Sequence, residues 1–148
     1  MIFENNYKVA YLESYRESIN EEASISDEIE EVMSRACKIT SSWSLVPGGG
    51  GNATGNPKIE GAVDSLLKLQ TNLAEQVIMS GQLRGNIEAA IKSVSDQRQQ
   101  NILRMRYING LSLKEISKRT STDYRWIREL HKRALEQIQL PDMPKYSA

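Results

Sequence analysis

The part of the sequence that most limits the fold lies between residues 96 and 138, where three short helical patterns are separated by two tight turns. Gly110 ends the first pattern, because glycine accepts the left-handed backbone found just beyond a helix C-terminus. Ser112 and Glu115 follow at the spacing of a capping box, in which each side chain bonds a free backbone N–H at the start of a helix. Residues 120–123 form the second turn. This arrangement predicts a helix-turn-helix.

The third helical pattern, residues 123–138, has one apolar and one polar face. Thr122 or Asp123 is placed to cap its start, because short polar side chains accept hydrogen bonds from the free N–H groups there. The apolar residues recur at steps of three and four and predict the inward face. They are Ile127, Leu130, Ala134 and Ile138. We expect Trp126 and His131 to pack between helices as well.

Charge is distributed unevenly along the chain, although the formal net charge is zero. Residues 96–138 contain ten Lys or Arg and five Asp or Glu, whereas residues 1–40 contain four and nine. A basic C-terminal module predicts binding to nucleic-acid phosphates. The acidic N-terminal part predicts a solvated helix face, with a partner-binding surface or a region that repels DNA as alternatives.

The candidate DNA-binding residues lie on the polar face of the third helix and around the two turns. They are Arg106, Ser112, Lys114, Lys118, Thr122, Tyr124, Arg125, Arg128, Glu129 and Lys132. Arginine forms two hydrogen bonds with guanine and glutamate accepts one from cytosine, so Arg125, Arg128 and Glu129 are the candidates for base contacts. The other cations are candidates for phosphate contacts, which position a protein without reading the sequence.

The N-terminal part contains two long amphipathic segments. Apolar residues recur at helical spacing over residues 6–40 and 58–95, and Pro57 suits the first turn of the second helix. The Gly-rich residues 41–57 predict a flexible connection, so a coiled-coil-like antiparallel hairpin is the simplest arrangement. Residues 6–40 fit either one helix or two. The apolar stripes fit the hairpin, a homodimer through the long helices, or both.

We therefore expect an all-α protein with three parts. A helical hairpin scaffold covers residues 1–95, a helix-turn-helix domain covers residues 96–140, and a tail covers residues 141–148. Trp43, in the connection, is expected to pack against the long helices.

Several kinds of site are not expected. One cysteine, Cys37, and one histidine, His131, cannot supply a Cys/His zinc site, and we expect no metal and no cofactor. The Gly-rich stretch lacks the Lys-Ser or Lys-Thr pair of a phosphate-binding loop. No nucleophile is placed beside a base, so an enzyme is not expected. The chain has neither a long apolar run nor a signal peptide at Met1, which predicts a cytoplasmic protein away from the membrane.

Residues 104–135 resemble sigma-factor region four, the helix-turn-helix that reads an upstream promoter element. The resembling features are Arg106-Tyr107, Gly110-Leu111-Ser112, Glu115-Ile116, Ile127-Arg128 and Arg133-Ala134-Leu135. With its long N-terminal helices, the chain is similar to the phage-encoded ArpU and RinA-like late transcription regulators of Gram-positive bacteria. That family usually has an apolar residue where Thr122 stands here, which predicts a slightly looser turn. No segment resembles the sigma region that binds core polymerase or melts the promoter.

The resemblance implies a DNA-binding regulator of phage transcription in the cytoplasm of a bacterial host. The helix over residues 123–138 would lie in the major groove of double-stranded DNA, and RNA polymerase is a further implied partner. Two alternatives remain open. One is a small-terminase-like DNA-packaging protein that assembles into a ring, and the other is a module that binds polymerase or a host protein.

Overall fold

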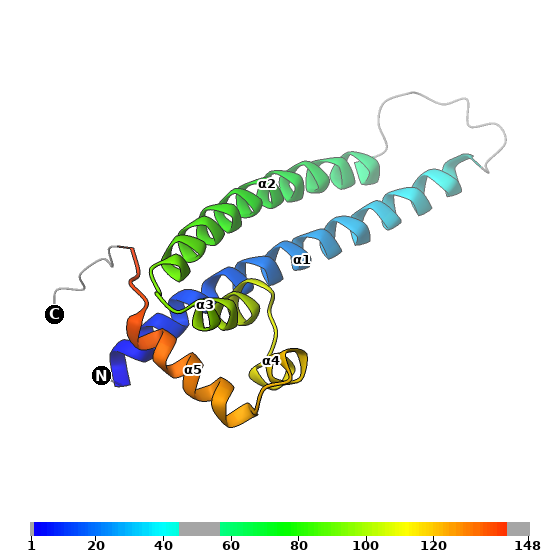
Figure 1. The fold of residues 1–148 in the computed structure, drawn as a ribbon. Coiled ribbons are helices and arrows are strands. Elements are labelled where there is room, and N and C mark those ends of the chain that lie inside the picture. The colour runs from blue at the N-terminus through cyan, green and yellow to red at the C-terminus, as the bar shows by residue number, and fades with distance from the viewer. Residues whose placement is uncertain (1, 45–56, 142–148) are drawn as a thin grey trace. The chain divides into compact units, whose positions relative to one another are not determined.

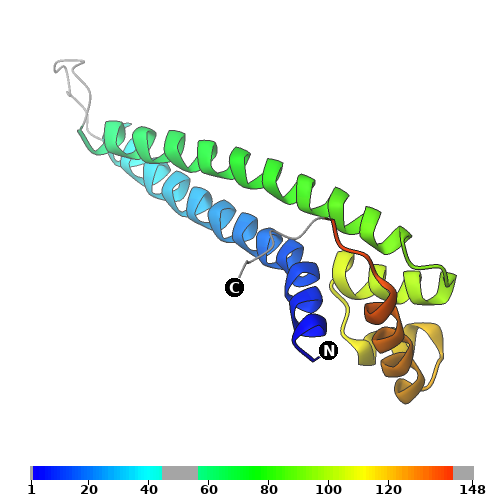
Figure 2. The same ribbon diagram turned by 90° about the vertical axis from the view of Figure 1, so that its left-hand side faces the viewer.

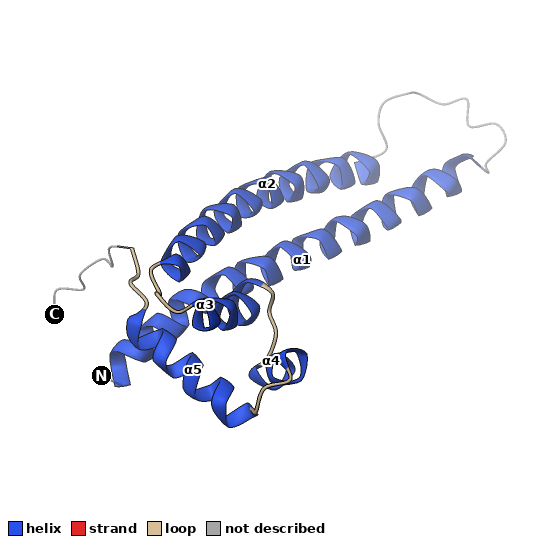
Figure 3. Cartoon of the chain, viewed as in Figure 1, coloured by secondary structure: helices blue, strands red, loops and turns tan. Residues whose placement is uncertain are grey.

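A computed structural model describes residues 2–44 and 57–141, with side chains described for residues 5–39 and 57–141. Every regular element in these residues is a helix, as Figure 3 shows, so the predicted all-α fold is confirmed. The glycine run, the side chain of Trp43 and the residues after Pro141 lie outside this part of the chain. The predicted packing of Trp43 therefore stays a prediction.

Two long helices form the N-terminal part of the chain (Figure 1). Helix α1 spans Ile2–Ser44 and helix α2 spans Pro57–Lys92. Because α1 is continuous, residues 6–40 form one helix rather than two. The helix also runs past residue 41, where the connection was predicted to begin. Pro57 is the first residue of α2, as predicted, since the first turn of a helix does not need its missing N–H.

Shorter helices form the C-terminal part. They are α3 (Gln97–Leu103), the π-helical turn η1 (Arg104–Ile108), α4 (Leu113–Thr120) and α5 (Tyr124–Gln137). These are the three predicted helices, because α3 and η1 together make the first of them. The wider turn of η1 is closed by the Asn109 N–H, which donates to the Arg104 carbonyl oxygen at 3.0 Å.

The chain divides into two compact units (Figures 1 and 2). The head unit comprises Met1–Ile19 and Met79–Ala148, and the hairpin unit comprises Asn20–Ile78. In the hairpin unit, α1 and α2 run antiparallel and side by side in both views. The head unit extends the predicted module of residues 96–140 by the first half of α1 and the last turns of α2.

The head unit has two hydrophobic core clusters. The buried members of the larger one are Leu12, Tyr15, Ile87, Ala90, Ile91, Val94, Leu103, Tyr107, Ile108, Ala134, Leu135 and Ile138. The buried members of the smaller one are Ile102, Ile116, Ile127 and Leu130. The smaller cluster holds the helix-turn-helix together, and the larger one joins it to the ends of the two long helices.

Two cationic side chains of α1 bond carbonyl groups at helix ends in the C-terminal part. Lys8 Nζ donates to the Leu135 carbonyl oxygen of α5 at 2.9 Å. Arg16 Nη1 donates to the Ile108 carbonyl oxygen, at the end of η1, at 3.2 Å. Positive charge is favourable at helix C-termini, because the last carbonyl groups carry the negative end of the helix dipole. These bonds fix α1 to the helix-turn-helix.

Gly110 lies against this contact, and its replacement should be costly. Its φ is +77°, and a Cβ there would lie 2.7 Å from the guanidinium carbon of Arg16. We expect Gly110→Ala to lower the free energy of unfolding by about 1–2 kcal/mol, because it strains the left-handed backbone and displaces Arg16. Urea denaturation measures the change. In the control Gly61→Ala, a Cβ meets nothing within 4 Å, so stability should rise slightly. Equal losses in the two variants would contradict the prediction.

Candidate nucleic-acid interface

Side-chain caps set the starts of the first two helices of the module. The Asp96 carboxylate accepts hydrogen bonds from the N–H groups of Arg98 and Gln99 at 2.8 and 3.2 Å. The predicted capping box is also present. The Ser112 N–H donates to Glu115 Oε2 at 2.9 Å, and the Glu115 N–H donates to Ser112 Oγ at 3.2 Å. Helix α4 therefore begins where the sequence predicted.

The turn between α4 and α5 differs in one detail from the prediction. Ser121 ends α4 in the left-handed conformation, with φ of 51°. Asp123 occupies the N-cap position of α5, but neither its side chain nor that of Thr122 caps the helix. The Thr122 hydroxyl instead donates to the Thr120 carbonyl oxygen at 3.1 Å. The predicted side-chain cap was wrong, because this hydroxyl bonds back into the turn.

Helix α5 has the two faces that the sequence predicted. Its inward stripe is buried and consists of Ile127, Leu130, Ala134 and Ile138. On the other face, Arg125, Arg128 and Lys132 are exposed, and none of them forms an ion pair with another described residue. The Arg128 guanidinium lies 5.7 Å from the ring centroid of Tyr124. Three cations on one face of a helix present a surface suited to phosphates and base edges.

Some of the other predicted site residues are exposed, and the rest are engaged in bonds within the protein. Lys114 and Lys118 are exposed on α4, and Ser112 is used in the capping box. Glu129 is bound by Arg133, with 3.2 Å between Oε1 and Nε. Arg106 is also held within the molecule. Its guanidinium donates to the Leu111 carbonyl oxygen at 3.4 Å and lies 3.9 Å from the carboxylate of Glu13.

A hollow of about 540 Å³ lies beside the polar face of α5. Arg125, Arg128 and Lys132 line it, together with Asn5 and Asn6 of α1. The two asparagines were not among the predicted site residues. No local pattern in the sequence could identify them, because they reach α5 only through the packing of the first turns of α1. The structure thus adds two hydrogen-bonding amides to the cationic surface.

His131 packs inside the head unit, as expected. Its Nε2 and the Tyr107 hydroxyl share a hydrogen bond of 2.8 Å, and their ring centroids are 5.7 Å apart. Burial lowers the pKa of His131 to about 4, and the nearby Arg106 guanidinium acts in the same direction. Burial also raises the pKa of Tyr107 above its ordinary value. Both side chains are therefore neutral at pH 7.

This pair should make the stability of the head unit depend on pH. Since the pKa of His131 falls from an ordinary 6.5 to about 4 on folding, the unfolded chain binds the proton more readily. The stabilisation is complete above pH 6.5 and is lost as the pH falls toward 4. We expect a loss of about 1–2 kcal/mol, allowing for the partial exposure of the ring. Urea denaturation at pH 7 and pH 5 measures it. An unchanged pH dependence in His131→Gln would contradict this assignment.

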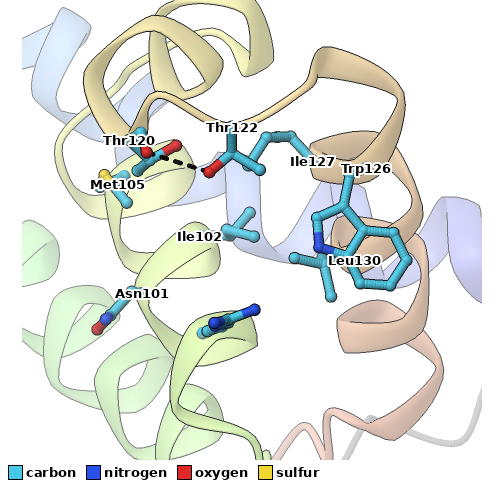
Figure 4. Close-up of a pocket in the computed structure, with 9 residues that line it drawn as sticks. Asn101, Ile102, Met105, Thr120, Thr122, Trp126, Ile127 and Leu130 are labelled. Carbon is cyan, nitrogen blue, oxygen red and sulfur yellow. Dashed lines mark hydrogen bonds between the residues drawn. The ribbon is translucent and has the colours of Figure 1, made fainter.

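Trp126, in contrast, does not pack between helices as expected. Its side chain is 39% exposed, and the Arg133 guanidinium lies 5.2 Å from its ring centroid. Trp126 lines a hollow of about 360 Å³. Figure 4 shows it there with Ile102 of α3 and with Thr122. The smaller threonine stands where the sequence comparison placed an apolar residue. The looser turn predicted from Thr122 stays a prediction.

The geometry above agrees with the comparison to known families. Residues 96–140 match the family model described as sigma-70, region 4. The matched residues cover α3, η1, α4 and α5, and this family is a DNA-binding helix-turn-helix domain. No curated protein and no solved structure gives a match to the chain. The resemblance to sigma-factor region four is confirmed for this module.

The charges follow the division into units. Counted over the sequence, the head unit has fifteen Lys or Arg and ten Asp or Glu, whereas the hairpin unit has four and nine. The sigma-region-four module thus lies in a unit with a surplus of five positive charges, and the hairpin unit has a surplus of five negative charges. Among the described residues, no helix is long and apolar enough to cross a membrane, and no three potential ligands are grouped to hold a metal ion.

Proposed function

We propose that this protein is a phage-encoded transcription regulator that reads double-stranded DNA through α5 in the major groove. The observation that carries the proposal is the polar face of α5. It presents Arg125, Arg128 and Lys132 within a module of sigma-region-four type. Arg125 and Arg128 supply base contacts, with Glu129 as a further candidate once it leaves Arg133. RNA polymerase is the proposed second partner, on the basis of the sigma resemblance.

Phosphate contacts in this proposal come from exposed lysines of α4 and α5. Lys114 and Lys118 of α4 and Lys132 of α5 are exposed, so they can reach the DNA backbone without breaking bonds within the protein. Arg106 would first have to leave Glu13 and the Leu111 carbonyl group. We therefore assign the phosphate contacts to the three lysines rather than to Arg106.

Binding to duplex DNA over a range of salt concentrations tests the proposal. Three phosphate contacts correspond to a fall in affinity of roughly 40-fold between 50 and 200 mM salt. Selection of bound sequences from a random duplex pool should also yield a defined site. Absence of binding, or binding that is insensitive to both salt and sequence, would refute the proposal.

A second candidate function is DNA packaging by a small-terminase-like ring. The exposed apolar side chains of the hairpin unit favour a protein that assembles with copies of itself. Molar mass from light scattering separates the two functions. A monomer or dimer favours transcription regulation, and eight or more subunits favour packaging.

A further inference from the structure

The side chains between the two helices of the hairpin unit are only half-buried. Between its helices, half-buried side chains recur at alternating steps of three and four residues, the spacing of a coiled coil. We call these residues the seam, and they are Ile25, Ile29, Val32, Ala36 and Ile39 of α1 and Ile59, Ala62, Leu66, Leu69, Leu73 and Gln76 of α2. No described side chain of this unit is fully buried, whereas the head unit has a complete core. Two helices alone leave their shared seam open on both sides.

One side of the seam is polar. Glu28, Glu31 and Arg35 of α1 line a hollow there with Ser65 and Lys68 of α2. Glu31 and Arg35 form an ion pair of 3.4 Å that is exposed to solvent. Charged side chains of both signs are stable in water, so this side needs no partner. We call it the polar side.

The opposite side of the seam is apolar. In an antiparallel helix pair, the residues that come directly after the seam residues lie on the same side of the seam in both helices. We call it the apolar side, and it includes Met33 and Cys37 of α1 and Val63, Leu67, Ala74 and Val77 of α2. Four of these, Met33, Val63, Leu67 and Val77, are 47–57% exposed. Large apolar side chains gathered on one face mark an interaction surface.

Two polar residues interrupt the apolar side at its middle, and two more, Ser26 and Glu60, follow the seam residues Ile25 and Ile59 nearer its ends. Glu30 follows the seam residue Ile29, and Gln70 follows Leu69. Arg35 of α1 and Ser65 of α2 line the same hollow, so they lie beside each other. Because the two helices are antiparallel, any two residues that lie side by side have numbers that sum to about 100. Glu30 and Gln70 therefore lie at the same level. A single polar position within an apolar contact commonly sets the register and orientation of associating helices.

We propose that two copies of this chain pack their hairpin units together through the apolar sides, forming a four-helix bundle. The partner that covers the apolar side must be a pair of helices, because this side runs along both α1 and α2. A second copy supplies this pair, and a two-fold axis matches the surface with itself. Packing of the two apolar sides would complete the core that the single hairpin lacks.

The sequence also favours one orientation of the two copies. In one orientation the two-fold axis is parallel to the helices. Helix α1 of one copy then packs on α2 of the other, and residues at the same height along the hairpin contact each other. Four of the five contacts then pair apolar with apolar or polar with polar side chains. The pairs are Cys37 with Val63, Met33 with Leu67, Glu30 with Gln70, Ser26 with Ala74 and Ala23 with Val77. With the axis across the hairpin, Glu30 would meet Glu30 of the partner subunit, which like-charge repulsion disfavours. Residues 20 and 78 of both copies then lie at one end of the bundle.

Light scattering of the full chain tests the proposal, independently of DNA binding. We expect a mass of twice 16.7 kDa for the wild type. Ala74→Arg should raise the dimer dissociation constant at least about 100-fold, because it places unpaired charges in the interface. Ala74 is exposed in the single chain, so the variant keeps the monomer fold, which circular dichroism verifies. The control Asn72→Arg, an exposed residue beside the polar side, should remain a dimer.

Two substitutions at Gln70 test the orientation. Gln70→Glu should weaken the dimer, because it faces Glu30 of the partner subunit, whereas Gln70→Lys should preserve or strengthen it. A monomeric wild type, a mass of more than two chains, or an Ala74→Arg variant as dimeric as Asn72→Arg would overturn the proposed dimer. Equal effects of the two Gln70 substitutions would overturn the proposed orientation. DNA binding by a monomeric wild type would refute the dimer while leaving the proposed function intact.

Discussion

Replacement of Leu12 by alanine is expected to lower the free energy of unfolding of the head unit by about 2–5 kcal/mol. Leu12 lies in α1, far outside the residues that match the sigma-region-four model, yet its side chain is completely buried. It belongs to the larger core cluster with Ile87, Leu103 and Tyr107. Truncation removes a buried isopropyl group and leaves a cavity between α1 and the helix-turn-helix. Urea denaturation, followed by circular dichroism, measures the loss.

Met79→Ala is the matched control for Leu12→Ala. Met79 also lies in the head unit but is exposed, so its truncation should change stability by less than about 0.5 kcal/mol. A loss at Leu12 no larger than the loss at Met79 would show that α1 does not complete the core. The same packing predicts that a fragment of residues 96–140 does not fold alone, because the fragment lacks Leu12, Ile87 and Ile91.

The sequence predicted the helices well because their signals are local. The capping box at Ser112 and Glu115 involves residues three positions apart, and the glycine at 110 acts through its own φ angle. The stripe of α5 is likewise set by helical spacing. Such features need no knowledge of the rest of the fold. They were found in the structure at the predicted residues.

The partners of the long helices could not be predicted in the same way. Helical spacing shows that Leu12 and Tyr15 are inward, but not which element covers them. Their stripe continues into the hairpin, so it indicated one uniform scaffold. The structure instead places them in the head unit, where Lys8 bonds the Leu135 carbonyl group across 127 positions of sequence. Contacts at this separation leave no trace in the local periodicity.

The candidate site shows the same limit. The exposure of Arg125, Arg128 and Lys132 followed from their positions opposite the apolar stripe of α5. The ion pair between Arg106 and Glu13 and the position of Asn5 beside α5 could not be predicted, because both depend on where α1 packs. Trp126 was misjudged for a related reason. A large aromatic ring favours burial, but this ring finds its partner in Arg133 on its own helix.

The second large effect is expected from Arg128→Ala in DNA binding. Arg128 lies in the second turn of α5, exposed and stacked near the Tyr124 ring, so its guanidinium is held away from the protein core. A guanidinium that bonds both acceptors of a guanine discriminates by about 1–3 kcal/mol against other bases. We expect the variant to bind its preferred sequence roughly 10- to 100-fold more weakly and to lose selectivity at one base pair.

Lys114→Ala separates base contacts from phosphate contacts. Lys114 is exposed on α4 and is proposed to contact only the DNA backbone, so its loss should weaken all sequences about equally. It should also reduce the slope of log affinity against log salt by about one. Titration of each variant with the selected duplex and with single-base mismatches distinguishes the two patterns. If Arg128→Ala reduces affinity uniformly across these duplexes, as Lys114→Ala should, then Arg128 contacts phosphate and α5 enters the groove with Arg125 leading.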